Sequence, residues 1–301
     1  MKIRIGYGFG VRTTVNDEGF ATVVDALETL RFDSLWLSER IGGEAPDPLV
    51  AMAFAAGRTK RLKFGMSVMV LPGRNPVVLA KELATLDRLS NGRLLPAFGL
   101  GVADPQEQQA FGVAREERAK RFDEALTVLR KCWLDDKVTH HGTFFHYDDL
   151  RVLPKPKQTP PEVWLGGIAP SELKRVGRLA DGWLPSFVTP DDVAVGRKVV
   201  EEVAAQHDRT IDPEHFGALI PYADGPLPDQ LVAGLRARRP DLDDVTKLVP
   251  QGWSGLTDTI GRFVDAGFSK FVVLPIVEPK SADAWADHLA EAAPKLLPLQ
   301  T

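Results

Sequence analysis

The sequence predicts an α/β protein and, within that class, a (β/α)8 TIM barrel. Short apolar runs alternate with segments of helical periodicity along the 301 residues, and eight of these runs have strand character. Several runs are continuously apolar, which is typical of parallel strands buried on both faces. A doubly wound open sheet is the alternative, but no G-x-G-x-x-G follows the first predicted strand. Neither a repeat nor a linker divides the sequence, so we expect a single domain over residues 1–301.

Local patterns place the individual elements. Strands are expected at 3–8, 34–37, 62–71, 94–99, 163–165, 182–184, 216–222 and 270–274. After Pro76, the residues Leu79, Leu83 and Leu86 recur at i, i+4 and i+7, which predicts an amphipathic helix. Further helices are expected at 117–134, 191–206, 257–266 and 282–295, with weaker candidates at 20–30, 48–56 and 171–180.

The connection after the third strand has clear punctuation. Pro72-Gly73 ends the strand, because proline cannot donate to a ladder. Asn75 suits the N-cap of the next helix, and Asn91-Gly92 suits a left-handed end to it. In a barrel the loop after a strand lies on the active face, so residues 67–75 are expected at the rim of the site.

The chain is longer than the roughly 250 residues of a typical barrel, which predicts insertions. We expect one after strand four, at 102–116, and one before strand five, at 138–161. The second carries HHGTFFHYDDL and the proline-rich PKPKQTPP, which favour a small hairpin followed by an extended connector. His140, His141 and His146 lack a regular ligand spacing, so no metal site is predicted there.

Composition excludes several classes of protein. A formal net charge of -4 argues against a nucleic-acid binder, and the basic cluster at 236–239 is interpreted as a solvated helix end. No apolar run reaches the roughly 18 residues of a membrane span, and the first residues lack the apolar core of a signal peptide, so a cytoplasmic protein is expected. Cys132 is the single cysteine, so no intrachain disulfide forms; it is interpreted as structural.

Five stretches in order resemble one family. They are FDSLWLSER, GMSVMVLPGRNPVVLAKELATLDRLSNGR with LLPAFGLGV after it, ERAKRFDEALTVLRKCW, PEVWLGGIAPSELKRVGRLADGWLPS and, more weakly, AGFSKFVVLP. The series resembles the luciferase-like monooxygenase superfamily, whose members are flavin- or deazaflavin-dependent oxidoreductases on a (β/α)8 barrel. The pattern is most similar to the branch that uses coenzyme F420. The resemblance also implies a homodimer.

The same resemblance implies a cofactor site. Ser67 and Val68 match a family position with a non-prolyl cis peptide, which forms a bulge behind the flavin or deazaflavin ring. Gly99, Leu100 and Gly101 match a segment beside the ring, although a plain tight turn is the simpler interpretation of two glycines.

A second group of positions is implied around the phosphate and the reacting face of the ring. Gly166, Gly167, Ile168 and Ala169 match the loop near the cofactor's phosphate, where free N–H groups at a helix N-terminus attract an anion. Ser186 is expected to line the cofactor cleft. Glu39 matches a family acid near the ring, and Arg40 replaces the usual histidine; a rim ion pair is the competing interpretation. Val102 stands where some F420 enzymes carry an acid proposed as a proton donor, so that role is not transferred; the nearest acids are Asp104 and Glu107.

These features predict an oxidoreductase that transfers a hydride between C5 of the deazaflavin and a small organic substrate. The cofactor would supply the difficult chemistry, while the protein orients it and excludes water. One alternative is an FMN-dependent monooxygenase on the same scaffold. A second is a non-catalytic protein that binds F420 or flavin.

Overall fold

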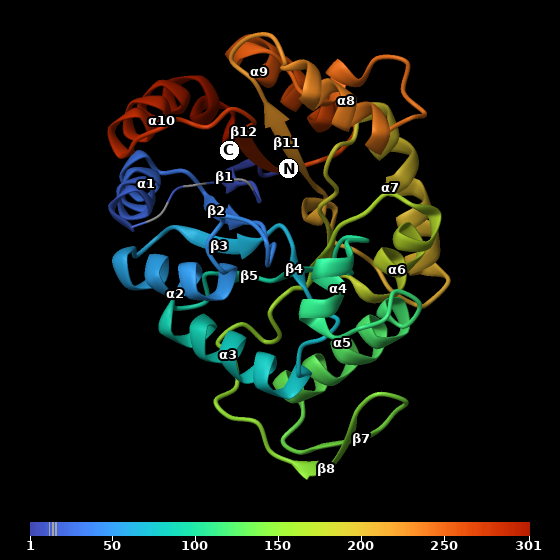
Figure 1. Cartoon of the computed structure of the whole chain (residues 1–301). Helices are drawn as coiled ribbons and strands as arrows, with labels where there is room; N and C mark the ends of the chain where they lie inside the picture. Colours follow the sequence, from blue (N-terminus) through green and yellow to red (C-terminus); the bar gives the residue numbers. More distant parts are fainter. Residues whose placement is uncertain (12, 14, 16) are drawn as a thin grey trace.

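A computed structural model describes residues 1–11, 13, 15 and 17–301. Strands occupy the middle of the molecule and helices surround them (Figure 1). The parallel strands are β1 (Arg4–Phe9), β2 (Ser34–Leu37), β3 (Lys63–Met66), β4 (Met69–Val70), β5 (Leu94–Leu95), β6 (Ala97–Gly99), β9 (Trp164–Leu165), β10 (Gly182–Trp183), β11 (Gly217–Tyr222) and β12 (Lys270–Pro275). Each of the eight predicted runs therefore contains strand structure, and the α/β class is confirmed.

The strands form two parallel sheets that follow the order of the chain. One sheet has the order β11-β12-β1-β2-β3-β5, and the other has the order β10-β9-β6-β4. Two predicted strands are each split between the sheets. The run 62–71 divides at the Ser67–Val68 bond, and the run 94–99 divides at Pro96, which has no N–H for a ladder. Isolated parallel bridges pair Trp183 with Phe216 and Ser186 with Leu219, next to β10 and β11.

Helices follow most of the strands. They are α1 (Asp17–Leu30), α2 (Pro48–Arg58), α3 (Pro76–Leu89), α4 (Pro105–Phe111), α5 (Arg118–Leu134), α6 (Pro170–Leu179), α7 (Pro190–Ala205), α8 (Asp229–Arg238), α9 (Gly252–Asp265) and α10 (Ala282–Leu296). Short 3-10 turns occur at Pro213–His215, Val245–Leu248 and Leu297–Leu299. The sequence patterns gave no indication of α4 and α8, because both are short and each buries only one residue. No helix among the described residues is long and apolar enough to cross a membrane.

The connection after β4 has the predicted chemistry. Asn75 caps α3 by accepting hydrogen bonds from the N–H groups of Val77 and Val78, at 3.0 and 3.2 Å. Asn91 and Gly92 close the helix with positive φ values of 64° and 81°. The strand-to-helix turn that the sequence suggested is therefore confirmed in detail.

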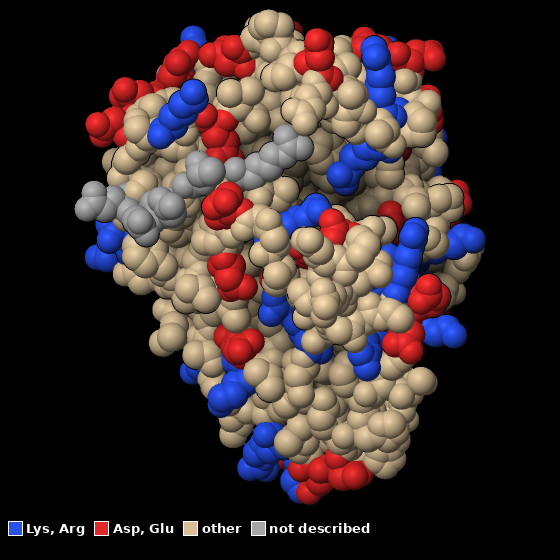
Figure 2. Space-filling view, viewed as in Figure 1, with Lys and Arg blue, Asp and Glu red and all other residues tan. Residues whose placement is uncertain are grey.

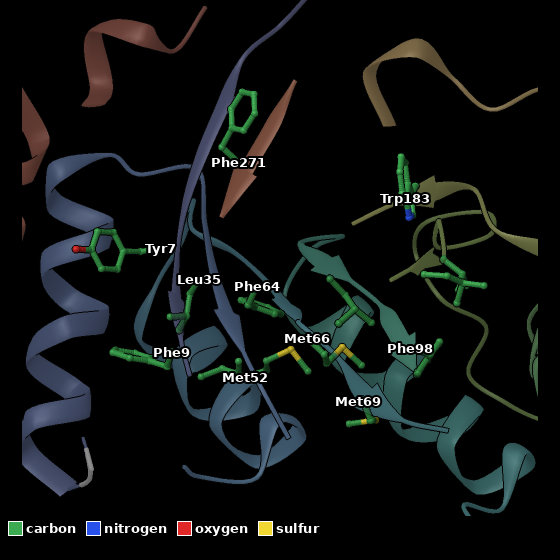
Figure 3. Close-up of a cluster of buried hydrophobic side chains, with 14 of the residues drawn as sticks. Tyr7, Phe9, Leu35, Met52, Phe64, Met66, Met69, Phe98, Trp183 and Phe271 are labelled. Atoms are coloured by element: carbon green, nitrogen blue, oxygen red, sulfur yellow. The ribbon is translucent and has the colours of Figure 1, made fainter. Parts of the chain in front are cut away.

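Alternate residues of the strands pack on different clusters. On β12, Phe271 and Val273 join the large core between strands and helices, which Figure 3 shows in part, whereas Val272 packs with Trp36 and Trp164 in a smaller cluster. Cys132 is buried in the large core, as expected of a structural cysteine. Leu184 and Leu219 belong to the same smaller cluster and also line a cavity.

The segment 138–161 forms a hairpin and then an irregular connector. Strands β7 (Val138–His141) and β8 (His146–Leu150) pair antiparallel and project from one end of the molecule (Figure 1). His140 pairs with Glu124 and His141 with Asp148, at 3.1 and 2.6 Å. Within the described residues, no group of three or more His, Cys, Asp or Glu could hold a metal ion.

Candidate active site

One cavity of about 620 Å³ lies at the carboxyl ends of the strands. Its volume falls within the range of ligand pockets. Figure 2 shows the surface hollowed near the middle of this face, with basic side chains around the hollow. The cavity is lined by most of the site residues expected from the sequence: Glu39, Arg40, Ser67, Val68, Gly99, Leu100, Gly101, Gly166, Gly167, Ile168 and Ser186. Ala169 is not part of the lining; it is exposed immediately after Ile168.

Glu39 is held in place at the end of β2. Its carboxylate accepts a hydrogen bond from the Val70 N–H at 2.7 Å and another from the Arg74 guanidinium. Arg74 also donates through Nε to the Val70 carbonyl, at 2.9 Å. Burial raises the pKa of Glu39, while Arg74 and the Val70 N–H act in the opposite direction. Glu39 therefore connects β2 to the turn after β4.

Arg40 forms ion pairs at the rim of the cavity. Its Nη2 lies 3.2 Å from Asp104 Oδ2, and its Nε lies 3.7 Å from Glu107 Oε1. Glu107 also accepts from the Gly42 N–H at 3.2 Å, and Asp104 caps α4 through the Gln106 N–H at 2.8 Å. The rim ion pair, which the sequence offered as a competing interpretation of Arg40, is present. It links α4 to the loop after β2. Both acids near the Val102 position are thus engaged.

The Ser67–Val68 peptide bond is cis, as the resemblance implied. The Val68 side chain lies against β6: a Cβ added to Gly99 would sit 2.5 Å from Val68 Cγ2. Position 99 therefore favours glycine, because the Cβ of any other residue would clash with the Val68 side chain. Val68 and Gly99 therefore form one continuous piece of the cavity wall.

The loop before α6 differs from the expectation of free N–H groups. Glu172, in the first turn of α6, accepts hydrogen bonds from the Ile168 and Ala169 N–H groups at 3.1 and 3.0 Å. Gly167 has a φ of 92°, and a Cβ there would lie 2.5 Å from Glu172 Oε2. Two of the donors assigned to a phosphate are therefore bound to the protein's own carboxylate. Glu172 also lines the cavity.

Three arginines from other segments reach the cavity. Arg175, from α6, pairs with Asp123 at 2.7 Å, while Arg238 and Arg239 come from the end of α8. The interpretation of 236–239 as a solvated helix end is wrong for Arg239, which is 5% exposed and pairs with Asp192 and Asp241 at 2.9 and 2.7 Å. These carboxylates raise the pKa of Arg239.

Arg238 lies beside this pair and stacks on an aromatic ring. Its guanidinium carbon is 4.3 Å from the centroid of the Phe187 ring, and both residues line the cavity. The sequence patterns did not identify this end of α8 as part of the site, because the resemblance was weak in the C-terminal third. The signal that the sequence offered for this part of the site was the pair Arg238-Arg239, which follows a stretch where no helix or strand was expected.

The wall formed by β11, β12 and α8 is largely apolar. It presents Leu219, Pro221, Leu231, Leu274 and Ile276 to the cavity. Glu278 follows this wall and accepts a hydrogen bond from the Thr13 hydroxyl at 2.6 Å. The cavity therefore combines apolar surface with a few polar and charged groups, as small-molecule sites commonly do.

Comparison with known proteins identifies the family. The family model described as luciferase-like monooxygenase matches residues 11–260. The chain belongs to this family. Among curated proteins, the chain is similar to an F420-dependent glucose-6-phosphate dehydrogenase of Amycolatopsis mediterranei, with 33% identity over 207 residues, or 62% of this chain and 61% of the relative. A limonene 1,2-monooxygenase of Rhodococcus erythropolis is 29% identical over 63% of this chain and 51% of its own length.

The curated matches are partial, whereas the structural matches cover nearly the whole chain. This family member spans about half to three fifths of the length of the first curated relatives it matches. A solved F420-dependent secondary alcohol dehydrogenase in complex with an F420-acetone adduct matches with a TM-score of 0.79, 22% identity and 98% and 99% coverage of the two chains. An FMN complex of the oxygenating constituent of 3,6-diketocamphane monooxygenase from Pseudomonas putida matches with a TM-score of 0.77 and 18% identity. This match covers 100% of this chain and 99% of the other. At these identities the likeness shows a shared fold.

Proposed function

We propose that the protein is an F420-dependent oxidoreductase that transfers a hydride between C5 of the deazaflavin and a small organic substrate. The observation that carries the proposal is the coincidence of the cavity with the family's cofactor positions: residues from five separate loops, matched in the sequence, line one space. The family match over residues 11–260 and the F420-dependent relatives favour the same conclusion.

We also propose that the eight parallel strand positions form one closed (β/α)8 barrel. The bridges of Trp183 to Phe216 and of Ser186 to Leu219 support closure between β10 and β11. Ladders from β3 to β5 and from β4 to β6 support continuity on the other side, where both long strands are split. A closed barrel gathers all strand ends on one face, which explains how loops far apart in sequence share one cavity.

The cavity residues suit a flat tricyclic ring. Val68 offers an apolar surface that rests on β6, and Leu100 and Ile168 add further apolar contacts. When bound, F420 would supply a two-electron hydride carrier that reacts at a ring carbon. The chain would hold it: Val68 would back one face of the ring, and Ser67 and Ser186 would offer hydroxyls to its polar edge.

The other residues would prepare the side open to substrate. The Glu39–Arg74 pair positions a carboxylate beside β4, and Arg40 with Asp104 and Glu107 holds α4 at the rim. The apolar wall from β11, β12 and α8 would keep water from the reacting groups. Arg40 and Glu39 are proposed to orient substrate and ring.

Titration of the purified protein with F420 and with FMN tests the cofactor. We expect F420 to bind more tightly, measured by quenching of the ligand fluorescence. Tight FMN binding without detectable F420 binding would instead support the monooxygenase alternative. Substrate-driven bleaching of bound F420 would distinguish an enzyme from a carrier: a panel of alcohols that leaves the F420 absorbance unchanged would favour the carrier.

A further inference from the structure

Glu172 occupies the place where an anionic group of a ligand would gain most from α6. Its Oε2 accepts from the N–H groups of both Ile168 and Ala169, at 3.1 and 3.0 Å. Ala169 is the N-cap of α6, a helix of ten residues, and Ile168 precedes it, so both N–H groups lie next to the helix end whose dipole favours negative charge. A second anion cannot use the same two donors while the carboxylate remains in place.

Glu172 is part of the cavity wall as well as a helix cap. It lines the cavity together with Gly167, Ile168 and Arg175. Its carboxylate also fills the space beside Gly167, since a Cβ at that glycine would lie 2.5 Å from Oε2. Glu172 stands at N3 of α6 and completes its capping box with the Ala169 N–H, so the same carboxylate stabilises the helix and places a negative charge beside the cavity.

Cations are available on the same wall. Arg175 lies one turn further along α6, and its Nε is 2.7 Å from Asp123. Arg238 also lines the cavity, and no carboxylate within the described part of the chain lies at ion-pair distance from it. An anionic group that displaced Glu172 would therefore meet both helix N–H groups and a basic wall.

We propose that Glu172 competes with the ligand's phosphate for the N-terminal end of α6 and so weakens the binding of phosphate-bearing cofactors. The inference rests on the proposed function, because it takes a tricyclic cofactor with a phosphate as the ligand of this cavity. It makes Glu172 a residue that determines ligand specificity: the wild-type protein gains little from the phosphate, and neutralising Glu172 restores that gain.

One ligand pair that differs only at the phosphate, FMN and riboflavin, measures this directly. In Glu172→Gln the amide oxygen still accepts from the N–H groups but the negative charge is removed. We expect the ratio of phosphate-bearing to phosphate-free affinity to rise roughly three- to tenfold, as is typical of one charge at a helix terminus. A ratio that stays constant or falls would overturn the proposal.

Glu28→Gln is the matched control. Glu28 also accepts from backbone N–H groups, those of Arg61 and Leu62 at 3.0 and 2.7 Å, and it lies outside the cavity lining. The control changes the net charge by the same amount, so an equal rise in the affinity ratio in both variants would point to the overall field and contradict the proposal. Thermal unfolding of both variants verifies that the fold is intact.

Inorganic phosphate separates this inference from the proposed function. If no flavin or deazaflavin binds to any variant, the proposed function fails, and the backbone amide resonances of Ile168 and Ala169 are then followed during phosphate titration. Shifts that saturate at lower phosphate concentration in Glu172→Gln than in the wild type would support the competition. Equal or absent shifts in the two proteins would overturn it.

Discussion

Arg74 and Glu39 join the turn after β4 to the end of β2. The Arg74 guanidinium donates to one carboxylate oxygen of Glu39, and the Val70 N–H donates to the other. The Glu39 side chain is 3% exposed, and these partners offset part of the cost of burying its charge. The turn at Pro72-Gly73 therefore brings Arg74 back toward Glu39.

Arg74→Met should destabilise the protein more at pH 7 than at pH 5. Burial raises the pKa of Glu39 in the folded state, so this group's contribution to stability is greatest below its unfolded pKa and is lost as pH rises through the folded pKa. Removing Arg74 raises that pKa further and leaves a buried charge at neutral pH. We expect a loss of about 2–4 kcal/mol at pH 7, measured by urea unfolding.

Glu39→Gln provides the control for this pair. The amide has no charge to compensate. Adding Arg74→Met to Glu39→Gln should therefore cost less stability than Arg74→Met costs in the wild type, and this cost should be the same at pH 7 and pH 5. An equal cost of Arg74→Met in both backgrounds would show that the pair does not interact energetically.

Gly99→Ala should be destabilising because of Val68. The new Cβ would lie 2.5 Å from Val68 Cγ2, and overpacking of this kind costs about 1–3 kcal/mol. Val68→Ala in the same chain should recover most of the loss, since it removes the clashing methyl group. Gly57→Ala is the matched control: nothing lies within 4 Å of a Cβ there, and alanine is the better residue inside α2, so no loss is expected.

The double variant decides the origin of the effect. If Val68→Ala fails to rescue Gly99→Ala in urea unfolding, the glycine is needed for another reason.

Periodicity and punctuation predicted the fold because they report local physics. The Asn75 cap, the Asn91-Gly92 end of α3 and the strand at 34–37 depend on neighbouring residues, and all agree with the structure. The splits at Ser67–Val68 and at Pro96 concern pairing between distant strands, which no local pattern contains. Helix α8 was missed because it buries little more than Leu235 and so shows no apolar stripe.

The positions matched to the family predicted where the cavity lies, but they did not predict which side chains of the protein pack against one another in its wall. The resemblance matched Gly99 to a segment beside the ring and Gly167 to the phosphate loop, and the structure adds that Val68 and Glu172 lie against these two glycines. These contacts join residues from different loops, so spacing alone could not indicate them. Arg239 was assigned to solvent for the same reason: its partners, Asp192 and Asp241, include one residue almost fifty positions away.

Arg239→Ala should destabilise the protein, whereas Arg238→Ala should not. Arg239 is buried and donates to Asp192, Asp241 and the Phe187 carbonyl, so its removal leaves acceptors without a partner. We expect a loss of about 2–4 kcal/mol in urea unfolding. Arg238 is exposed, and its loss should stay within about 0.5–1 kcal/mol, mainly from the contact with the Phe187 ring. Similar losses for both variants would contradict the assignment of Arg239 as the structural member.

Assembly remains an expectation from the family resemblance. A twofold dimer is the commonest soluble oligomer, and light scattering should give twice the 33.0 kDa mass of one chain at micromolar concentration. A mass of one chain across that range would exclude a stable dimer.

The last prediction concerns His288, which lies against two buried tyrosines outside the cavity. His288 Nε2 is 2.7 Å from the Tyr7 hydroxyl and 2.5 Å from the Tyr222 hydroxyl, and the Tyr222 and His288 rings are stacked with centroids 6.0 Å apart. Burial lowers the pKa of His288, because the charged imidazole loses its hydration among these aromatic rings.

A lowered pKa in the folded state fixes the sign of the pH effect. The unfolded chain binds the proton more readily, so this group's contribution to stability is present above the ordinary histidine pKa and is lost as pH falls below it. His288→Phe keeps an aromatic ring and removes the titration, although the tyrosine hydroxyls then lose a hydrogen-bond partner. We therefore expect a variant that is less stable at pH 8 but loses less stability than the wild type between pH 7 and pH 5. Urea unfolding at several pH values measures this difference, and parallel pH profiles for the two proteins would show that His288 does not set the acid sensitivity of the fold.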